Sequence, residues 1–456
     1  MSANPIHVPA PAPLAPVPAA RQLAWQRREF IAFVHFGVNT FTDREWGLGN
    51  EDPAIFNPSE LDCHQWVAAI KAAGMKQVII TAKHHDGFCL WPSAYTEHSV
   101  KNSPWRGGRG DVVRELSEAA AAGGLDFGVY LSPWDRHEPS YGSGQAYNEH
   151  YLKQLRELLT NYGPISEIWF DGACGEGPNG KRQVYDFRRF WGTVRELAPN
   201  AVMFSDEGPD VRWVGNESGY SDDPQWSTVN RFEMGIGASN AAQTHGHLGG
   251  SDWLPAETDV SIRPGWFYHA AEDDQVHSLD HLLDIWHRSV GLNTVLLLNL
   301  PPDRRGLIHE NDVARLAELR AALEDEYRVD HAFGAPAVAS NVRGGCAAFG
   351  AAKAVDGDDG TYWATDDGVT SASLEIALPA APTVARAKLA EFIELGQRVT
   401  GFRLELKAGG SWGTVAEGQT IGYQRLLRFE PRAAQAARLT ITGSRACPCV
   451  RTLGLY

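Results

Sequence analysis

The feature that most constrains the fold is a series of short apolar runs that recur along the first two thirds of the chain. The runs are residues 30–34, 77–81, 127–131, 167–170, 201–204 and 294–298. They do not alternate between apolar and polar residues, so both faces of each predicted strand should be covered. Segments with apolar residues at helical spacing lie between them, at 61–73, 112–122, 151–161 and 184–197.

This alternation predicts parallel strands that are joined by helices. Its extent favours a closed (β/α)8-like TIM barrel over an open sheet. No glycine-rich dinucleotide fingerprint follows the first run, which weakens the open-sheet alternative. Residues 222–259 show no dependable repeat and are expected to form long loops at the active site that can include irregular strands. A helix over 311–327 is expected to close the barrel.

The chain of 456 residues is predicted to contain three parts. Residues 1–20 are rich in Pro and Ala, which is typical of a flexible, extended tail. Residues 21–332 form the barrel. From 333 to 456 the pattern changes to short alternating runs with Gly-rich turns, such as 373–378, 401–407 and 437–442. That pattern predicts an all-β sandwich.

Composition excludes several functions. Lys and Arg number 41 against 56 Asp and Glu, which gives a formal net charge of −15. Such a balance argues against nucleic-acid partners and anionic membranes. No run approaches the roughly 18 apolar residues of a membrane span. The N-terminus has no signal-peptide pattern, so we expect a soluble, cytoplasmic protein, or a periplasmic or secreted one if that end was processed. The oligomeric state stays open.

Polar and aromatic side chains directly follow five of the predicted strands. In a parallel barrel these positions converge on one mouth, where active sites lie. The residues are His35, then Lys83 to Asp86, Ser132 to Asp135, Asp171, and finally Asp206 and Glu207. Five strands that end in this way predict an active site.

Asp171 is a carboxylate at the end of a buried run, where it is costly unless it is used or paired. An N-cap or a loop salt bridge is the alternative interpretation. Glycoside cleavage needs two such groups, a nucleophile and a proton donor. The candidates for the second are Asp206, Glu207 and Glu217, and the residues alone leave Glu207 and Glu217 close to tied.

A metal site is a competing interpretation of His84-His85-Asp86. Neighbouring side chains usually point apart, and no HxH or HExxH spacing is present. The six cysteines form no CxxC pair and are expected to be mostly free thiols. We therefore predict neither a metal nor a cofactor.

Several separated motifs resemble glycoside hydrolase family 29, the α-L-fucosidases. They are Phe33-Val34-His35-Phe36-Gly37 with Glu45-Trp46, Lys83-His84-His85-Asp86-Gly87-Phe88, Val129-Tyr130-Leu131-Ser132-Pro133 and Trp169-Phe170-Asp171-Gly172. The resemblance covers roughly residues 25–330 and agrees with a barrel. It implies a retaining exo-fucosidase in which Asp171 is the nucleophile and forms a covalent glycosyl-enzyme.

The resemblance also implies the remaining roles. Gly215-Asn216-Glu217 looks like the acid/base motif of the subgroup selective for α-1,3/1,4 linkages, which favours Glu217 over Glu207. Arg212 would orient Glu217 or touch the leaving sugar, while His269, His277 and His287 are expected to be structural. The residues expected to hold fucose or wall its pocket are His35, Glu45, Trp46, His84, His85, Tyr130 and Trp266.

The C-terminal part resembles a discoidin-type, galactose-binding-like domain, on Ala351 to Asp358 and Tyr362-Trp363-Ala364-Thr365. Such a domain would bind sugar, brace the barrel or border the leaving-group site. The substrate expected for the whole chain is a branched, Lewis-type fucosylated oligosaccharide or glycoconjugate. The alternatives are a broad-specificity α-L-fucosidase and a catalytically silent fucose-binding protein.

Overall fold

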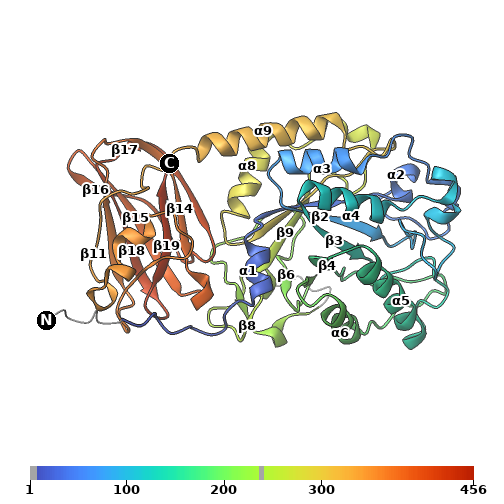
Figure 1. Cartoon of the computed structure of the whole chain (residues 1–456), viewed down its shortest axis with the longest axis horizontal. Helices are drawn as coiled ribbons and strands as arrows, with labels where there is room; N and C mark the ends of the chain where they lie inside the picture. Colours follow the sequence, from blue (N-terminus) through green and yellow to red (C-terminus); the bar gives the residue numbers. More distant parts are fainter. Residues whose placement is uncertain (1–7, 236–240) are drawn as a thin grey trace.

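The computed structural model describes residues 8–235 and 241–456, which form a closed barrel followed by a β-sandwich (Figure 1). The barrel strands are all parallel and are ordered β1-β10-β9-β6-β5-β4-β3-β2. The predicted (β/α)8-like barrel is thereby confirmed. The strands are β1 (Phe30–Val34), β2 (Gln77–Lys83), β3 (Asp126–Leu131), β4 (Glu167–Trp169), β5 (Val202–Ser205), β6 (Val211–Trp213), β9 (Ala256–Ser261) and β10 (Val295–Asn299).

Helices surround the barrel, and local capping sets where several of them begin. Asp62 accepts hydrogen bonds from two backbone N–H groups at the start of α3, and Asp111 and Asp186 each accept one at the starts of α4 and α6. The helices are α1 (Ala20–Gln26), α2 (Val38–Thr42), α3 (Cys63–Ala72), α4 (Val112–Gly123), α5 (Gln145–Asn161), α6 (Phe187–Leu197), α7 (Ala241–His245), α8 (Leu279–Arg288) and α9 (Glu310–Glu326).

The strands divide their apolar side chains between two cores. On β1, Phe30 and Val34 pack outward into the layer between strands and helices, whereas Ile31 and Phe33 point into the barrel. Both sets are buried, which explains why these runs lack apolar–polar alternation. Trp25 of α1 joins the interior cluster and closes the end of the barrel at which the strands begin.

Two barrel strands, β6 and β9, were not predicted from the sequence. β6 has only three residues, and β9 reads Ala-Glu-Thr-Asp-Val-Ser yet is buried along its whole length. Glu257 and Asp259 lie two residues apart on β9 and therefore face the same side, the barrel interior. Residues 222–259 were expected to form long loops that can include irregular strands. They contain a small hairpin of β7 (Thr228–Val229) and β8 (Asp252–Trp253) and lead into β9, which is a regular barrel strand.

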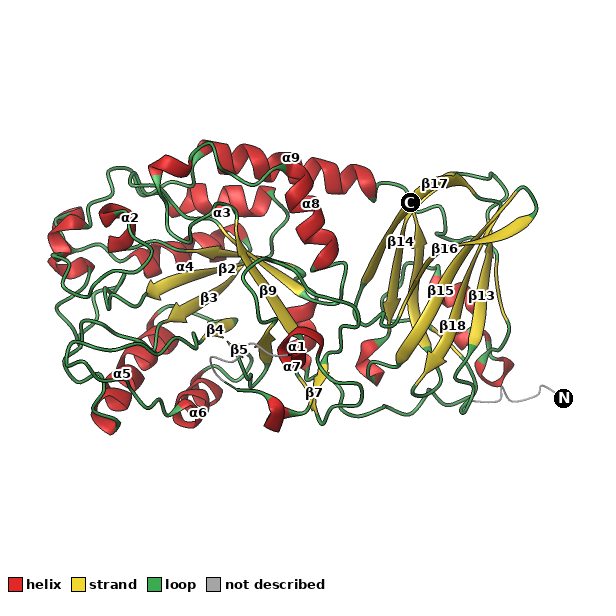
Figure 2. Cartoon of the chain, turned by 180° about the vertical axis from the view of Figure 1, so that it is seen from behind, coloured by secondary structure: helices red, strands yellow, loops and turns green. Residues whose placement is uncertain are grey.

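The sandwich has two antiparallel sheets and packs where the barrel strands begin. Tyr423 Oη donates to Glu29 (3.1 Å), and its backbone N–H donates to Asn293 Oδ1 (2.7 Å). In Figure 2 the arrows of β2 and β3 point away from the sandwich. The sheets are β11-β13-β18-β15-β16 and β12-β19-β14-β17, built from β11 (Ala337–Ala339), β12 (Trp363–Ala364), β13 (Ala372–Ala377), β14 (Thr383–Glu391), β15 (Val399–Ala408), β16 (Ser411–Gly418), β17 (Arg425–Ala433), β18 (Ala436–Ser444) and β19 (Cys449–Leu455).

The described part of the N-terminal segment contacts the sandwich. Residues 1–7 of the predicted tail lie outside the described part of the chain, but residues 8–19 run along the sandwich before α1 (Figure 1). The guanidinium groups of Arg343 and Arg398 donate to the carbonyl oxygens of Pro9 (2.7 Å) and Ala12 (2.6 Å). Proline-rich chain has few backbone donors of its own, so its carbonyl groups are satisfied by these side chains.

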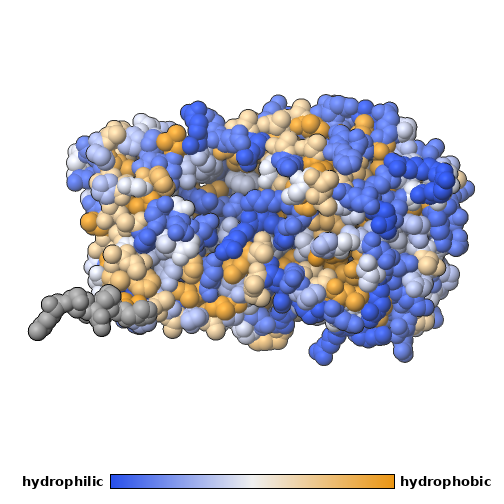
Figure 3. All heavy atoms as spheres, viewed as in Figure 1, coloured by the Kyte–Doolittle hydropathy of each residue, from blue (hydrophilic) through white to orange (hydrophobic). Residues whose placement is uncertain are grey.

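Burial of apolar side chains in the cores leaves many hydrophilic side chains on the outer surface. Hydrophilic side chains cover much of the face in Figure 3, with apolar residues scattered between them. Within residues 8–235 and 241–456, no helix has the length and apolar character needed to cross a membrane.

Candidate active site

A pocket of about 130 Å³ lies at the end of the barrel where the strands finish. Its volume is well below that of pockets for drug-sized ligands, so it suits a single small ring. It contains nine of the ten residues predicted for the site, and Arg212 is the exception. The lining residues are Phe33, His35, Glu45, Trp46, His84, His85, Tyr130, Trp169, Asp171, Ala173, Glu217, Asp259 and Trp266.

Asp171 follows β4 and is held by hydrogen bonds to both carboxylate oxygens. Tyr130 Oη donates to Oδ2 (2.8 Å), and the backbone N–H of Ala173 donates to Oδ1 (2.7 Å). His85 Nε2 lies 3.8 Å from Oδ2. The side chain is 23% exposed, so a ligand in the pocket can reach it. These contacts fix the direction in which the carboxylate faces the pocket.

Glu217 enters the same pocket from the loop after β6. Gly215 and Gly219 bound this loop with φ values of 93° and 72°, which favour glycine. Trp266 Nε1 donates to Glu217 Oε2 (3.2 Å). Burial raises the pKa of Glu217 against the effect of this bond, and the charge of Asp171 raises it further. The pocket therefore pairs an oriented carboxylate with a carboxyl group that retains its proton more strongly than usual.

Glu207, the competing candidate, is not among the residues that line the pocket. It follows β5, and its carbonyl oxygen accepts a hydrogen bond from Arg231 (3.1 Å). Burial also raises the pKa of Glu207. Position in the pocket, rather than a raised pKa, is what distinguishes Glu217 from Glu207.

The three pocket histidines are neutral, because burial lowers the pKa of each, that of His35 to about 3. Asn299 Oδ1 accepts from His35 Nδ1 (2.8 Å), since the Asn299 amide N–H groups donate elsewhere. Nδ1 of His35 therefore carries the proton, and Nε2 is left as an acceptor.

His84 and His85 carry their protons on different ring nitrogens. Asn39 Nδ2 lies 3.4 Å from His84 Nδ1 and can only donate, so the proton of His84 is on Nε2. Ser132 donates its hydroxyl to a carbonyl and accepts from His85 Nδ1 (2.8 Å), which leaves His85 Nε2 as an acceptor. The pocket thus offers both donors and acceptors, as the hydroxyl groups of a sugar require.

Glu45 fixes one wall of the pocket. It accepts hydrogen bonds from the backbone N–H groups of Trp266 (2.8 Å) and Phe267 (3.1 Å), and it contacts His269 Nε2 (2.7 Å). Burial opposes protonation of His269, but hydrogen bonds to Asp43 and Glu45 outweigh it and raise the pKa of His269. His269 was expected to be structural, and it supports the pocket through Glu45.

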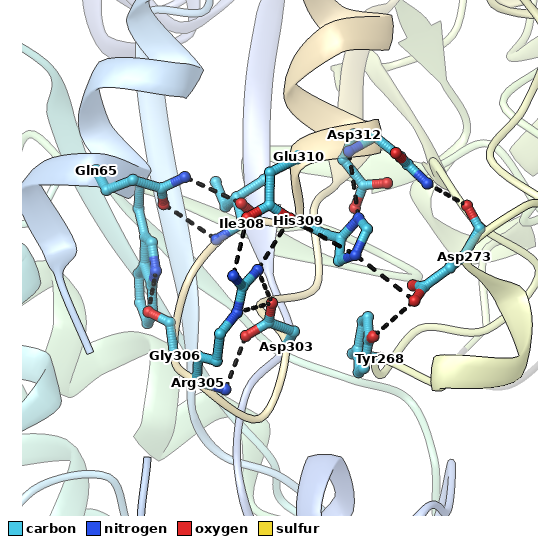
Figure 4. Close-up of polar contacts among 12 residues, drawn as sticks. Gln65, Tyr268, Asp273, Asp303, Arg305, Gly306, Ile308, His309, Glu310 and Asp312 are labelled. Carbon is cyan, nitrogen blue, oxygen red and sulfur yellow. Dashed lines mark hydrogen bonds and ion pairs between the residues drawn. The ribbon is translucent and has the colours of Figure 1, made fainter. Parts of the chain in front are cut away.

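The segment that carries Trp266 is anchored on its other side by an ion-pair network around the buried Arg263. Arg263 donates to Asp312 (2.9 Å) and to Asp273 (2.8 Å), and Tyr268 Oη donates to Asp273 (3.1 Å). Figure 4 shows Tyr268 and Asp273 facing the start of α9, where Asp312 and His309 lie. Trp266 is therefore held by bonds on both sides.

Arg212 does not reach the pocket, and its predicted contact with substrate is not supported. It lies on β6 and is fully buried. Its guanidinium group donates to the carbonyl oxygens of Gln243 (2.9 Å), Trp226 (2.9 Å) and Leu254. A buried guanidinium needs acceptors, and these carbonyl groups supply them. Arg212 therefore organises the loops after β6.

Four lining residues were not predicted: Phe33, Trp169, Ala173 and Asp259. Phe33 and Trp169 were assigned to the strand core, because apolar periodicity does not show which residue ends at the mouth. Asp259 lies on β9, which was not recognised as a strand. The signal available was its spacing from Glu257, since two acids two residues apart share one face of a strand.

A parallel barrel with paired carboxyl groups, neutral histidines and tryptophan walls at its mouth has the architecture of a glycoside hydrolase. Comparison with known proteins agrees. The sequence profile of the α-L-fucosidases matches residues 20–325, and that of a NedA-like, galactose-binding domain matches residues 353–439. The chain belongs to the α-L-fucosidases, glycoside hydrolase family 29, and carries a C-terminal galactose-binding-like domain.

Individual relatives cover nearly the whole chain. "Alpha-L-fucosidase 1" of Arabidopsis thaliana is 44% identical over 98% of this chain and 89% of its own. The crystal structure of SpGH29 has a TM-score of 0.93 at 42% identity and covers 98% of this chain and 99% of its own. A fucosidase of Ruminococcus gnavus in complex with fucose has a TM-score of 0.92 at 34% identity, over 99% of this chain and 96% of its own. The protein is therefore a glycoside hydrolase with α-L-fucosidase activity.

Proposed function

We propose that the protein removes terminal α-linked fucose by a retaining, double-displacement mechanism in which Asp171 is the nucleophile and Glu217 the acid/base. The observation that carries this proposal is the shared pocket of an oriented, accessible Asp171 and a Glu217 with a raised pKa. Glycoside cleavage requires one ionised and one protonated carboxyl group, and different surroundings of the two groups produce this difference.

In the first step, an Asp171 oxygen attacks the anomeric carbon of fucose, and the bond from that carbon to the leaving oxygen breaks. Glu217 donates its proton to the leaving oxygen, so the aglycone departs as an alcohol and fucose remains as an ester of Asp171. In the second step, Glu217 takes a proton from water, whose oxygen attacks the anomeric carbon and releases Asp171. Two inversions return the original anomeric configuration.

The histidines and Tyr130 would orient the sugar. His35 and His85 present acceptors and His84 presents a donor, so three hydroxyl contacts can form without any change of protonation. Tyr130 already donates to Asp171 and would hold it during the attack. Trp46 and Trp266 supply apolar surface against which the C5 methyl group of fucose would pack.

We propose α-1,3/1,4-linked fucose on branched, Lewis-type glycans as the substrate. The support is the likeness of Gly215-Asn216-Glu217 to the acid/base motif of that subgroup, together with the 57% exposure of Trp46 at the pocket. An exposed indole at this place offers a stacking surface to a second sugar. A broad-specificity enzyme would instead cleave α-1,2 and α-1,6 fucosides at similar rates.

The experiment compares the wild type with Asp171→Ala on an aryl fucoside and on a panel of fucosylated oligosaccharides that differ only in linkage. We expect the variant to lose turnover on every substrate, and the wild type to favour α-1,3/1,4 linkages. Near-wild-type activity of Asp171→Ala would remove the assignment. Equal rates across the panel would replace the linkage proposal with the broad-specificity alternative.

Glu217→Ala tests the second role, with Glu207→Ala as a matched control, because burial raises the pKa of both groups. Acid assistance is worth roughly 10²–10⁴-fold for poor leaving groups and much less for aryl groups. We expect Glu217→Ala alone to show this dependence on the leaving group and to be rescued by azide. Azide rescue of Glu207→Ala instead would move the role to Glu207.

A further inference from the structure

Asp259 is a third carboxyl group in the pocket, beside Asp171 and Glu217. It lies near the end of β9, and 3% of its surface is exposed. Trp213 Nε1 on the neighbouring strand β6 donates to its Oδ1 (2.7 Å). The backbone carbonyl of Asp259 accepts from Gly219 N–H (3.2 Å), in the loop that carries Glu217. Asp259 thus contacts both the strand and the loop on which Glu217 depends.

The surroundings of Asp259 contain anions and no compensating cation. Within residues 8–235 and 241–456, the structure gives Asp259 no ion pair with Lys, Arg or His. The charged groups that act on it are Glu217 and Asp171, and both are acids. Glu257, two residues earlier on β9, is a further acid deeper in the barrel. The three histidines that line the same pocket have lowered pKa values, so they supply no compensating positive charge.

We propose that Asp259 is a positioning residue of the active site that works as a neutral, protonated carboxylic acid throughout the catalytic cycle. The proposal rests on the roles of Asp171 and Glu217 given above. It concerns a different residue, however, and the charge state in which that residue acts.

The charge balance of the cycle supports a neutral Asp259. Before reaction Asp171, Glu217 and Asp259 carry one negative charge between them, on Asp171, and Glu217 is protonated. In the glycosyl-enzyme Asp171 is an ester, and Glu217 has become the carboxylate. A neutral Asp259 leaves the three groups with one negative charge in both states, whereas an ionised Asp259 would face a second carboxylate in each.

Burial supports the same conclusion, because it raises the pKa of Asp259 well above the ordinary value and the charges of Glu217 and Asp171 add to this effect. A neutral Asp259 can hold the Trp213 ring with its side chain, and the Glu217 loop with its backbone carbonyl, without adding a charge that would oppose formation of the Glu217 carboxylate.

The test compares Asp259→Asn, Asp259→Ala and Asp171→Asn with the wild type on an aryl fucoside and on a fucosylated oligosaccharide. Asn keeps the acceptor for Trp213 and the neutral state, so we expect kcat/KM within about threefold of the wild type and an unchanged alkaline limb of the pH profile. Asp259→Ala keeps the backbone bond to Gly219 but removes the acceptor of Trp213, four residues before Glu217. If Trp213 positions Glu217, this variant should lose about 100-fold on the oligosaccharide and less on the aryl fucoside. The identical change at an ionised carboxylate, Asp171→Asn, should abolish turnover.

Infrared difference spectra supply a measurement that a purely structural role would not affect. Subtracting the Asp259→Asn spectrum from that of the wild type at neutral pH should reveal the C=O stretch of a protonated carboxyl group. The symmetric and antisymmetric bands of a carboxylate in that difference would overturn the proposal. So would an Asp259→Asn variant that folds but loses turnover as Asp171→Asn does. Failure of the catalytic assignment itself would appear separately, as an active Asp171→Asn or a wild type inert towards fucosides.

Discussion

The buried ion pair of Lys83, at the end of β2, and Asp135 gives a sharp prediction about stability. Lys83 Nζ lies 2.8 Å from Asp135 and 3.0 Å from Gln154 Oε1, and the side chains of the pair are 0% and 3% exposed. Asp135 also accepts from the backbone N–H groups of His137 (3.0 Å) and Glu138 (2.8 Å). Removal of one partner of a buried pair costs about 3–5 kcal/mol, because a buried charge is left uncompensated.

The two single variants should therefore differ from the double variant. Lys83→Met leaves Asp135 with two N–H donors and should cost about 3 kcal/mol, and Asp135→Leu should cost about 5 kcal/mol. The double variant contains no unpaired charge and should lose only about 2 kcal/mol, for the two backbone bonds. At roughly 2 °C per kcal/mol for a large domain, Tm should fall by about 6, 10 and 4 °C respectively.

Thermal unfolding followed by near-UV circular dichroism measures these shifts, with activity before heating as the control for correct folding. A double variant whose Tm falls by the sum of the single shifts would refute the reasoning, because no coupling would then exist. Burial raises the pKa of Asp135, but Lys83 outweighs burial and lowers it. The pair therefore stabilises the fold above the ordinary Asp pKa of about 3.9, and this share is lost as the pH falls through the lower folded value.

Further expectations concern the pocket and the N-terminal segment. Tyr130→Phe removes a 2.8 Å hydrogen bond to Asp171 worth about 1.5–3 kcal/mol, so kcat/KM should fall at least tenfold while Tm stays near the wild-type value. Because the folded pKa of His269 is raised, its charged contact with Glu45 is fully present below about pH 6.5 and is lost as the pH rises through the raised value. KM for a fucoside should rise over that range in the wild type but not in His269→Gln. Deletion of residues 1–13 removes the bonds of Arg343 and Arg398 to that segment, and should lower Tm by a few degrees without changing kcat/KM.

The sequence predicts much of the barrel because apolar side chains are needed on both faces of most strands. Ile31 and Phe33 fill the interior while Phe30 and Val34 face the helices, so the run is apolar throughout. β9 is different, because Glu257 and Asp259 point inward. Acidic residues within a buried strand interrupt the apolar run by which such a strand is recognised. Here one of them, Asp259, lines the pocket.

The site could be predicted where a side chain directly follows a strand. Asp171 and His35 are placed by strand order, because the ends of parallel strands converge. Glu217 and Trp266 lie in loops whose positions depend on hydrogen bonds to residues far away in the sequence, such as those of Glu45 to the Trp266 segment. Resemblance to a family was needed to choose Glu217 and Trp266. It did not show that Arg212 is buried away from the pocket, because the carbonyl acceptors of Arg212 come from loops without a sequence pattern.

The most direct test of the mechanism is identification of the residue that carries the glycosyl-enzyme. A 2-fluoro fucosyl fluoride slows the second step more than the first, so the ester accumulates and can be located by peptide mass spectrometry. We predict one label per chain, on Asp171 in the peptide that contains Trp169-Phe170-Asp171-Gly172, with loss of activity in proportion to labelling. A label on any other residue, or inactivation without a covalent label, would contradict the account.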